Sequence, residues 1–170
     1  MNRRLLTFLV AALVGVGTAL YLRAQNDPRT REIRRIQKHL LQLATDVSFT
    51  ERDTPFQRLG YPGRLPDYFT DPAHFQIAIG RYLADQPLSH AELRDATTAI
   101  RAQFRGLSVQ FLDIVVELAD PPDQATAHLT SKIYFTGDAD YWIQEFRLTL
   151  ARAEASWRIQ HLATLRTMDR

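Results

Sequence analysis

The sequence predicts an α+β domain preceded by one transmembrane helix. The chain starts with a long apolar stretch that contains no charged residue. A capping motif marks a helix in its middle, and four runs of alternating apolar and polar residues follow, separated by short turns. Consecutive strands joined by short turns pair antiparallel, so we expect a sheet of four long strands. The N-terminal half of the domain should add a short strand and helices.

The apolar stretch within residues 1–23 predicts a single membrane span. Leu5–Leu22 contains 18 residues without a charge, bracketed by Arg3, Arg4 and Arg23. Eighteen helical residues rise about 27 Å, close to the lower limit for crossing the apolar core of a bilayer. The alternatives are a cleaved signal peptide, with a small-residue cleavage site inside the run, and a buried helix of a soluble protein. We favour an uncleaved anchor because the apolar run continues beyond that site.

A collar of basic residues follows the predicted span: Arg23, Arg29, Arg31, Arg34, Arg35 and Lys38. Next to a membrane such a collar is expected to contact anionic headgroups, although a solvated helix surface would have the same composition. Arg3, Arg4 and the N-terminal amine favour a cytoplasmic N-terminus, whereas the collar favours the opposite orientation. We predict a single-pass protein of the bacterial inner membrane with a periplasmic domain, because a short N-terminal tail before one early span is the common plan for export.

The composition excludes several kinds of site. Hydrophobic residues make up 45% of the sequence and charged residues 24%, as in an ordinary globular domain, which we expect over residues 24–170. The absence of cysteine excludes disulfides, thiolate metal sites and a cysteine nucleophile. The five histidines have no metal-ligand spacing, so we predict no metal site and no cofactor. The basic residues do not interleave with aromatic residues, and no nucleic-acid partner is predicted.

Two helices are predicted from their ends and their apolar spacing. An Asp-Pro pair and apolar residues at helical intervals predict an amphipathic helix over residues 28–46. Ser89 and Glu92 form a capping box at the start of a second helix, and Gly106 follows it as a stop signal.

The rest of the domain is predicted to be irregular first and then strand-rich. Prolines and glycines interrupt residues 51–88, leaving one or two helical turns over 65–70 and a short strand over 75–79. From there the apolar period changes from 3.6 to 2. Four strands are predicted, joined by turns of hairpin length, over residues 107–119, 124–135, 141–153 and 156–167.

Three local motifs and their order resemble those of a known superfamily. Tyr68-Phe69-Thr70-Asp71 precedes the short strand like the segment "YFtdD", residues 107–116 resemble a first long strand, and Trp157-Arg158-Ile159 opens the last strand like "W-R-I". Over roughly residues 30–168 the chain resembles the nuclear transport factor 2-like superfamily, in particular its SnoaL-like bacterial branch. The resemblance implies a curved sheet wrapped around the helices as a cystatin-like cone, which often holds a ligand pocket. Proteins of this fold include isomerases, hydrolases, transport factors and assembly proteins, so the fold does not assign a function.

Strand alternation predicts which side chains face the inside of the sheet. The inward set is Leu112, Ile114, Val116 and Leu118 on the first long strand, Ala125, Ala127, Leu129, Ser131, Ile133 and Phe135 on the second, Gln144, Phe146, Leu148 and Leu150 on the third, and Trp157, Ile159, His161, Ala163 and Leu165 on the last. The candidate pocket residues are therefore His161, Gln144, Ser131, Trp157 and, from the second helix, Phe104. Every strand carboxylate falls on the outward side, so no catalytic residue is assigned.

His161 is the best single candidate for a reactive group, because histidine titrates near neutral pH. Two other interpretations compete with this one. His161 could be a core histidine bonded to a backbone carbonyl, or a bulge could move it to the outward face. His39 and His90 are expected on solvated helix surfaces.

Three functions remain open at this stage. The favoured one is a non-catalytic interaction module of the cell envelope, whose outward sheet face contacts an envelope protein or a second copy of the chain. That face is predicted to carry Asp113, Glu117, His128, Lys132, Glu145, Arg147, Arg158 and Arg166. The alternatives are a carrier of a small apolar ligand in the cone, and a SnoaL-like isomerase or hydrolase-type enzyme that uses His161. A cone filled by large side chains would argue against this enzyme.

Overall fold

The computed structural model describes residues 27–54, 63–79, 82–137 and 140–165. The chain divides into two compact units between Arg35 and Ile36. The predicted anchor, residues 1–23, lies outside the described residues and stays a prediction. Within the described ranges, no helix combines the length and the apolar character needed to cross a membrane.

Helix α2 (Pro28–Val47) begins in the first unit and ends in the second, close to the predicted range of 28–46. In the first unit, the four arginines predicted to contact a membrane are exposed: Arg29, Arg31, Arg34 and Arg35. Arg35 pairs with Glu32 at 2.7 Å, three residues earlier on the helix. In the second unit, α2 buries an apolar stripe at helical spacing: Ile36, Leu40, Leu43 and Ala44.

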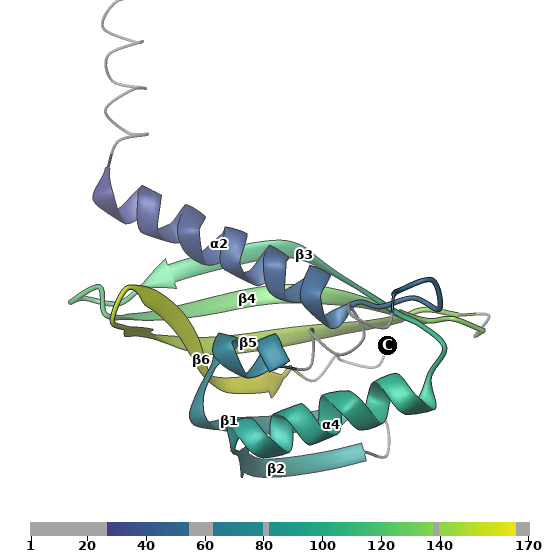
Figure 1. Ribbon diagram of the computed structural model, residues 1–170. Helices are drawn as coiled ribbons and strands as arrows, with labels where there is room; N and C mark the ends of the chain where they lie inside the picture. Colours follow the sequence, from purple (N-terminus) through teal and green to yellow (C-terminus); the bar gives the residue numbers. More distant parts are fainter. Residues whose placement is uncertain (1–26, 55–62, 80–81, 138–139, 166–170) are drawn as a thin grey trace, which may run out of the picture. The chain divides into compact units, whose positions relative to one another are not determined.

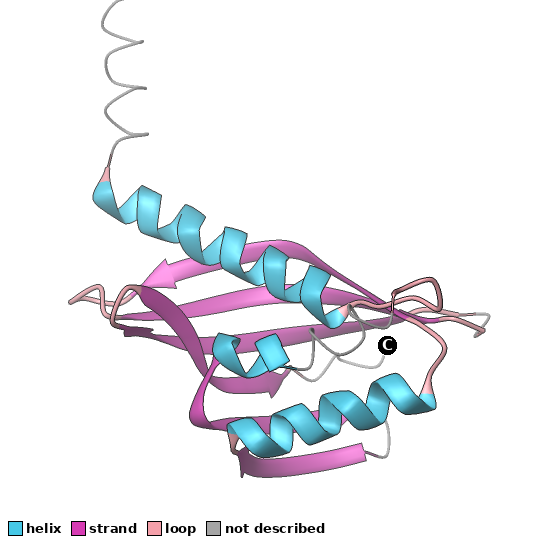
Figure 2. Cartoon of the chain, in the orientation of Figure 1, coloured by secondary structure: helices cyan, strands magenta, loops and turns pink. Residues whose placement is uncertain are grey.

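The second unit contains one six-stranded sheet in the order β2-β1-β6-β5-β4-β3 (Figures 1 and 2). The strands are β1 (Phe69–Ile79), β2 (Tyr82–Leu88), β3 (Leu107–Leu118), β4 (Gln124–Phe135), β5 (Trp142–Ala153) and β6 (Ser156–Thr164). Neighbouring strands are antiparallel, except that β1 and β6 are parallel. The α+β class and the four long C-terminal strands are therefore as predicted.

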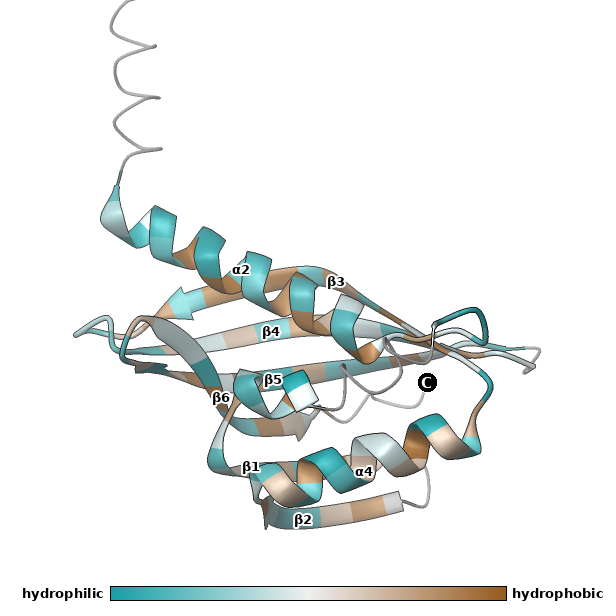
Figure 3. Ribbon diagram, in the orientation of Figure 1, coloured by the Kyte–Doolittle hydropathy of each residue, from teal (hydrophilic) through white to brown (hydrophobic). Residues whose placement is uncertain are grey.

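Burial alternates along the central strands, as the sequence predicted. On β4, Ala125, Ala127, Leu129 and Ser131 are buried, and hydrophobic and hydrophilic bands alternate along the strand in Figure 3. On β5, the buried residues are Gln144, Phe146, Leu148 and Leu150. We call the face that carries these buried residues the inner face of the sheet, and the opposite face the outer face.

The predicted irregular character of residues 51–88 is wrong over their C-terminal part. The predicted short strand at 75–79 belongs to the longer strand β1, which pairs with β2 as a hairpin. Strand β2 was not predicted because it contains Pro87, and proline cannot donate a hydrogen bond to a neighbouring strand. Since β2 lies at the edge of the sheet, it tolerates this proline. The helical turn predicted within 65–70 is present as the 3₁₀ helix η1 (Leu65–Tyr68).

Helix α4 (His90–Gln103) has the predicted capping box in full. The Ser89 side chain accepts from the Glu92 amide, and the Glu92 carboxylate accepts from the Ser89 amide at 2.8 Å. Gly106 has a different role from the predicted stop, because the helix ends three residues before it. A Cβ at Gly106 would lie 2.5 Å from Thr136 Oγ1 and 3.2 Å from the Phe49 carbonyl oxygen, so this glycine permits a close approach of two segments.

Two register shifts change the inward set predicted for the sheet. On β3, the shift falls between Leu112 and Val115, and Asp113 has a φ of 51° there. Before the shift, Phe111 pairs with the buried Ser131, so Leu112 belongs to the outer face and not to the inner face as predicted. After it, Val116 pairs with the buried Ala127 and is inward as predicted. Strand alternation alone does not reveal such a bulge.

Candidate functional site

Three of the predicted pocket residues lie on the inner face and are buried in the core. Ser131 is buried on β4, and Trp157 on β6 is 5% exposed. Gln144 on β5 is also buried, and its Nε2 donates to the backbone carbonyls of Leu165 at 2.7 Å and Glu145 at 3.0 Å. Side chains that are buried in this way belong to the core and do not line an open pocket.

His161 lies on the outer face, which corrects its predicted place inside the cone. The register of β5 and β6 shifts so that Leu150 pairs with Ile159 and Thr149 with His161. Gln160 is the extra residue of this bulge. The β6 residues after Gln160 therefore lie on the face opposite to the one that strict alternation predicts. The His161 ring lies 5.2 Å from that of His74, and His74 Nε2 is 2.6 Å from Asp85 Oδ1.

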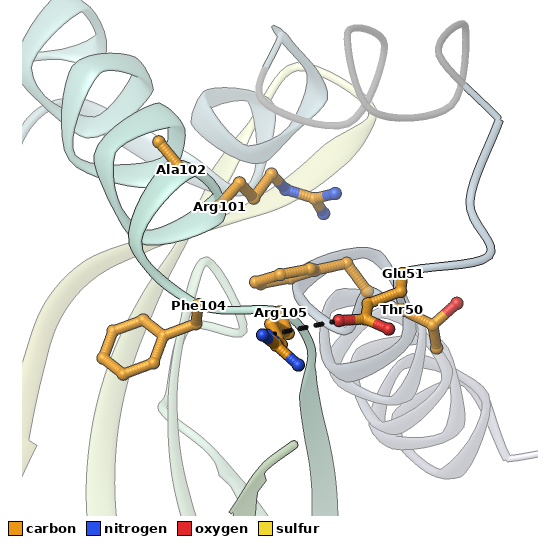
Figure 4. Close-up of a pocket in the computed structure, with 7 residues that line it drawn as sticks. Thr50, Glu51, Arg101, Ala102, Phe104 and Arg105 are labelled. Atoms are coloured by element: carbon orange, nitrogen blue, oxygen red, sulfur yellow. Dashed lines mark ion pairs between the residues drawn. The ribbon is translucent and has the colours of Figure 1, made fainter. Parts of the chain in front are cut away.

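Phe104, the fifth predicted pocket residue, lines a groove of about 450 Å³ at the end of α4 (Figure 4). The Phe49 ring forms part of the wall, with the Arg101 guanidinium carbon 4.7 Å from its centroid. Arg105 and Glu51 form an ion pair of 3.6 Å, drawn dashed in Figure 4. Phe104 also packs on Phe135 at 4.5 Å between ring centroids. The groove is therefore an aromatic surface with an ion pair beside it.

A second pocket, of about 270 Å³, contains a buried carboxylate that the sequence analysis did not select. Asp46, at the end of α2, is buried. Tyr68 Oη donates to Asp46 Oδ2 at 2.6 Å, and Gln42 Nε2 donates to Asp46 Oδ1 at 2.9 Å. Arg101 donates to the Asp46 backbone carbonyl at 3.1 Å. Burial and the hydrogen bond to Asp46 raise the pKa of Tyr68 well above its ordinary value, so the phenol stays protonated at neutral pH.

His39 lines the same pocket and is not on a solvated surface as predicted. Its ring lies 4.7 Å from the Tyr68 ring. Burial lowers the pKa of His39, and a hydrogen bond with the Trp157 backbone partly opposes this effect. His39 is therefore neutral at pH 7. The remaining lining residues, Arg64 and Asp67, are exposed.

The sequence held one signal for this cluster. His39, Leu43 and Asp46 recur at intervals of four and three residues, which places all three on one side of α2. The apolar residues on that side of α2 predict a buried face. A carboxylate in the last helical turn, however, is usually exposed to solvent, so the sequence does not indicate that Asp46 is buried. Tyr68 completes the cluster from η1, and no local sequence pattern indicates that contact.

The outer face of the sheet carries exposed apolar side chains among charged ones. The apolar members are Leu112 and Val115 on β3, Tyr134 on β4 and Ile143 on β5, with exposed fractions of 42%, 55%, 41% and 56%. We call these four residues the outer patch. Among the described residues, no cluster of three or more histidine, aspartate or glutamate side chains is arranged to hold a metal ion.

Comparisons with known proteins identify the fold. No protein-family model matches the chain, and no curated protein matches its sequence. Solved structures do match. A candidate aromatic ring hydroxylase from Novosphingobium aromaticivorans is 18% identical with a TM-score of 0.65, over 82% of this chain and 91% of that one. A candidate scytalone dehydratase from the same organism is 14% identical with a TM-score of 0.64, over 84% and 88% of the two chains.

A third structure names the fold class directly. An NTF2-like protein of unknown function from Pseudomonas putida is 13% identical with a TM-score of 0.61, over 82% of this chain and 89% of that one. The second unit therefore has the nuclear transport factor 2-like, cystatin-like α+β fold. At this level of identity the likeness concerns the fold, and the chemistry of these proteins does not transfer with it.

Proposed function

We propose that this chain is a non-catalytic interaction module that pairs with a second copy of itself through the outer face of its sheet. In the cell, the predicted N-terminal span would hold the pair to a membrane, with the domain in the periplasm. The proposal rests chiefly on the outer patch, because its four large apolar side chains are exposed on one face of the sheet.

The pairing register places the outer patch as two pairs of residues, with Thr130 and Lys132 of β4 between them. Leu112 and Val115 flank the β3 bulge, and Leu112 pairs with Thr130. Ile143 on β5 pairs with Lys132, and Tyr134 lies two residues beyond Lys132 on β4. Exposed apolar side chains that gather on one face among polar residues are typical of protein interfaces. On a solitary sheet face, the same positions would favour polar residues.

The charges around the patch favour a second copy as the partner. Lys132 and Arg147 lie on the outer face together with Glu117 and Glu145. A two-fold axis places one patch against the same patch of the other copy, so a face that carries both signs can pair opposite charges across the axis. A face of one sign would repel its copy.

The filled cone argues against the alternative of an enzyme that uses His161. The β6 bulge turns His161 to the outer face. Trp157 and Phe146 are buried on the inner face. General acid–base catalysis requires the reactive group to reach a bound substrate, and His161 faces the other way.

The test is the oligomeric state of the purified full-length chain, measured by sedimentation equilibrium. We expect a dimer that Ile143→Arg weakens, because it replaces an apolar side chain of the patch with a charged one. Loss of such an apolar anchor costs about 2 kcal/mol, or roughly 30-fold in Kd. Ile100→Arg is the matched control, since Ile100 is an exposed isoleucine on α4 at 41%. It should leave the Kd unchanged.

The absence of cysteine permits a second readout. Thr130→Cys places one thiol in the middle of the outer face, opposite Leu112 and Glu145, and oxidation should join two chains there. Thr98→Cys on the exposed side of α4 is the control and should stay monomeric under the same oxidant. A monomer by sedimentation, or equal cross-linking of the two variants, would overturn the proposal.

A further inference from the structure

The pocket beside Asp46 is independent of the outer face and has its own binding chemistry. It measures about 270 Å³ and is lined by residues of α2 and of the segment around η1: His39, Asp46, Arg64, Asp67 and Tyr68. All of these belong to the second unit. Two aromatic rings and a buried carboxylate therefore share one small cavity.

The Asp46 carboxylate is held by neutral donors. Tyr68 Oη and Gln42 Nε2 each donate to one of its oxygens. Among the ion pairs of the described residues, none includes Asp46. The Arg101 guanidinium donates to the Asp46 backbone carbonyl at 3.1 Å. A positive charge that enters the pocket would in addition face the buried carboxylate itself.

The pocket is lined by two acidic side chains and one basic one: Asp46, Asp67 and Arg64. Tyr68 is a protonated phenol and His39 is a neutral imidazole, so neither contributes a charge. The His39 and Tyr68 rings, 4.7 Å apart, add aromatic faces that attract cations.

We propose that this pocket binds a small alkylammonium cation, with Asp46 as its counter-charge and His39 and Tyr68 as its aromatic contacts. An ammonium group on a short alkyl chain satisfies each feature of the cavity. Its charge pairs with the carboxylate, its methyl or methylene groups contact the rings, and its size suits the volume. A strongly hydrated metal cation would gain nothing from the aromatic wall.

The test uses choline and its neutral isostere 3,3-dimethylbutan-1-ol, titrated separately into the full-length chain by calorimetry at constant ionic strength. The two molecules share shape and hydroxyl group and differ in charge. We expect choline to bind at least tenfold more tightly than the isostere. Equal affinities, or no binding of choline above a sodium chloride blank, would overturn the proposal.

Two variants locate the binding. Asp46→Asn keeps the shape of the side chain and removes its charge, so it should reduce choline affinity about tenfold and abolish the preference over the isostere. Asp67→Asn, at an exposed lining position, should reduce the affinity less than threefold. Equal effects of the two variants would contradict Asp46 as the counter-charge. If Asp46→Asn unfolds, the choline-induced rise in Tm of the unsubstituted chain, absent with the isostere, remains a separate readout.

Discussion

At the scale of single residues, the hydrogen bond between Tyr68 and Asp46 links two elements of the second unit. It joins η1 to α2 through two buried side chains at 2.6 Å. Tyr68→Phe removes the donor and leaves the Asp46 carboxylate with Gln42 as its remaining side-chain donor. The expected loss in the free energy of unfolding is about 1–3 kcal/mol. Urea denaturation measures it, and a loss near zero would mean that the bond is not formed in solution.

The same residue predicts a pH dependence. The folded protein raises the pKa of Tyr68 above its unfolded value of about 10, so folding favours the protonated phenol. The resulting stability is complete below about pH 10 and is lost as the pH rises toward the folded pKa. Urea midpoints between pH 8 and pH 11 should fall more steeply for the unsubstituted chain than for Tyr68→Phe. Tyr134→Phe, at an exposed tyrosine, should keep the steep slope.

Single residues also show how far burial and sheet face can be predicted from the sequence. Ser131 and Gln144 were placed on the inner face correctly, because β4 and β5 pair without a register shift and keep strict alternation. The faces predicted for Leu112 and His161 are wrong. Leu112 adjoins the bulge of β3, and His161 follows the bulge of β6. Asp46 was missed because its burial depends on Tyr68, which lies 22 residues away in the sequence.

At the scale of elements, the N-terminus of α4 is specified locally and can be tested locally. Ser89→Ala removes the side chain that accepts from the Glu92 amide and should cost about 1 kcal/mol. Hydrogen bonds from the Ser89 backbone and side chain lower the pKa of Glu92, so this contribution is present above the ordinary glutamate pKa and is lost as the pH falls through the lowered value. Thermal melts should therefore separate the two proteins more at pH 7 than at pH 3. An equal separation would contradict the reciprocal box.

The bulge of β3 is the second element-scale feature. Asp113 has a φ of 51° there, a conformation that aspartate tolerates and β-branched residues resist. Asp113→Val should lower the free energy of unfolding by about 1–2 kcal/mol, whereas Asp113→Gly should not. Urea denaturation of both variants makes the comparison. If valine is no worse than glycine, the bulge is not held in the left-handed conformation.

Some elements are easier to predict from the sequence than others, and the reason is the sequence separation of the contacts that define them. Helix ends and hairpin turns depend on contacts between residues a few positions apart, so α4 and the order of the four long strands were predictable. The pairing of β1 with β6 and the position of β2 at the sheet edge depend on residues far apart in the chain. Pro87 then made the edge strand resemble a loop.

At the scale of the whole molecule, the outer patch and the Asp46 pocket lie on different parts of one domain and make independent claims. The patch is formed by β3, β4 and β5, and the pocket by α2 and the segment around η1. A dimer that does not bind choline would support the first claim and reject the second. A monomer that binds choline would do the reverse, so a single preparation of protein decides between the four combinations.

The predicted anchor gives the last whole-molecule test. If residues 1–23 span a membrane uncleaved, the full chain should remain in the membrane pellet after alkaline carbonate extraction, and a chain lacking these residues should be released. Extraction separates spanning proteins from those held by the basic collar alone. High salt screens the attraction of Arg29, Arg31, Arg34 and Arg35 to headgroups, but it does not release an apolar span from the bilayer. Intact mass tests the signal-peptide alternative in the same samples. Protease added to spheroplasts should digest the domain if it is periplasmic. A domain that resists the protease would be cytoplasmic, and the orientation predicted from Arg3 and Arg4 would then be wrong.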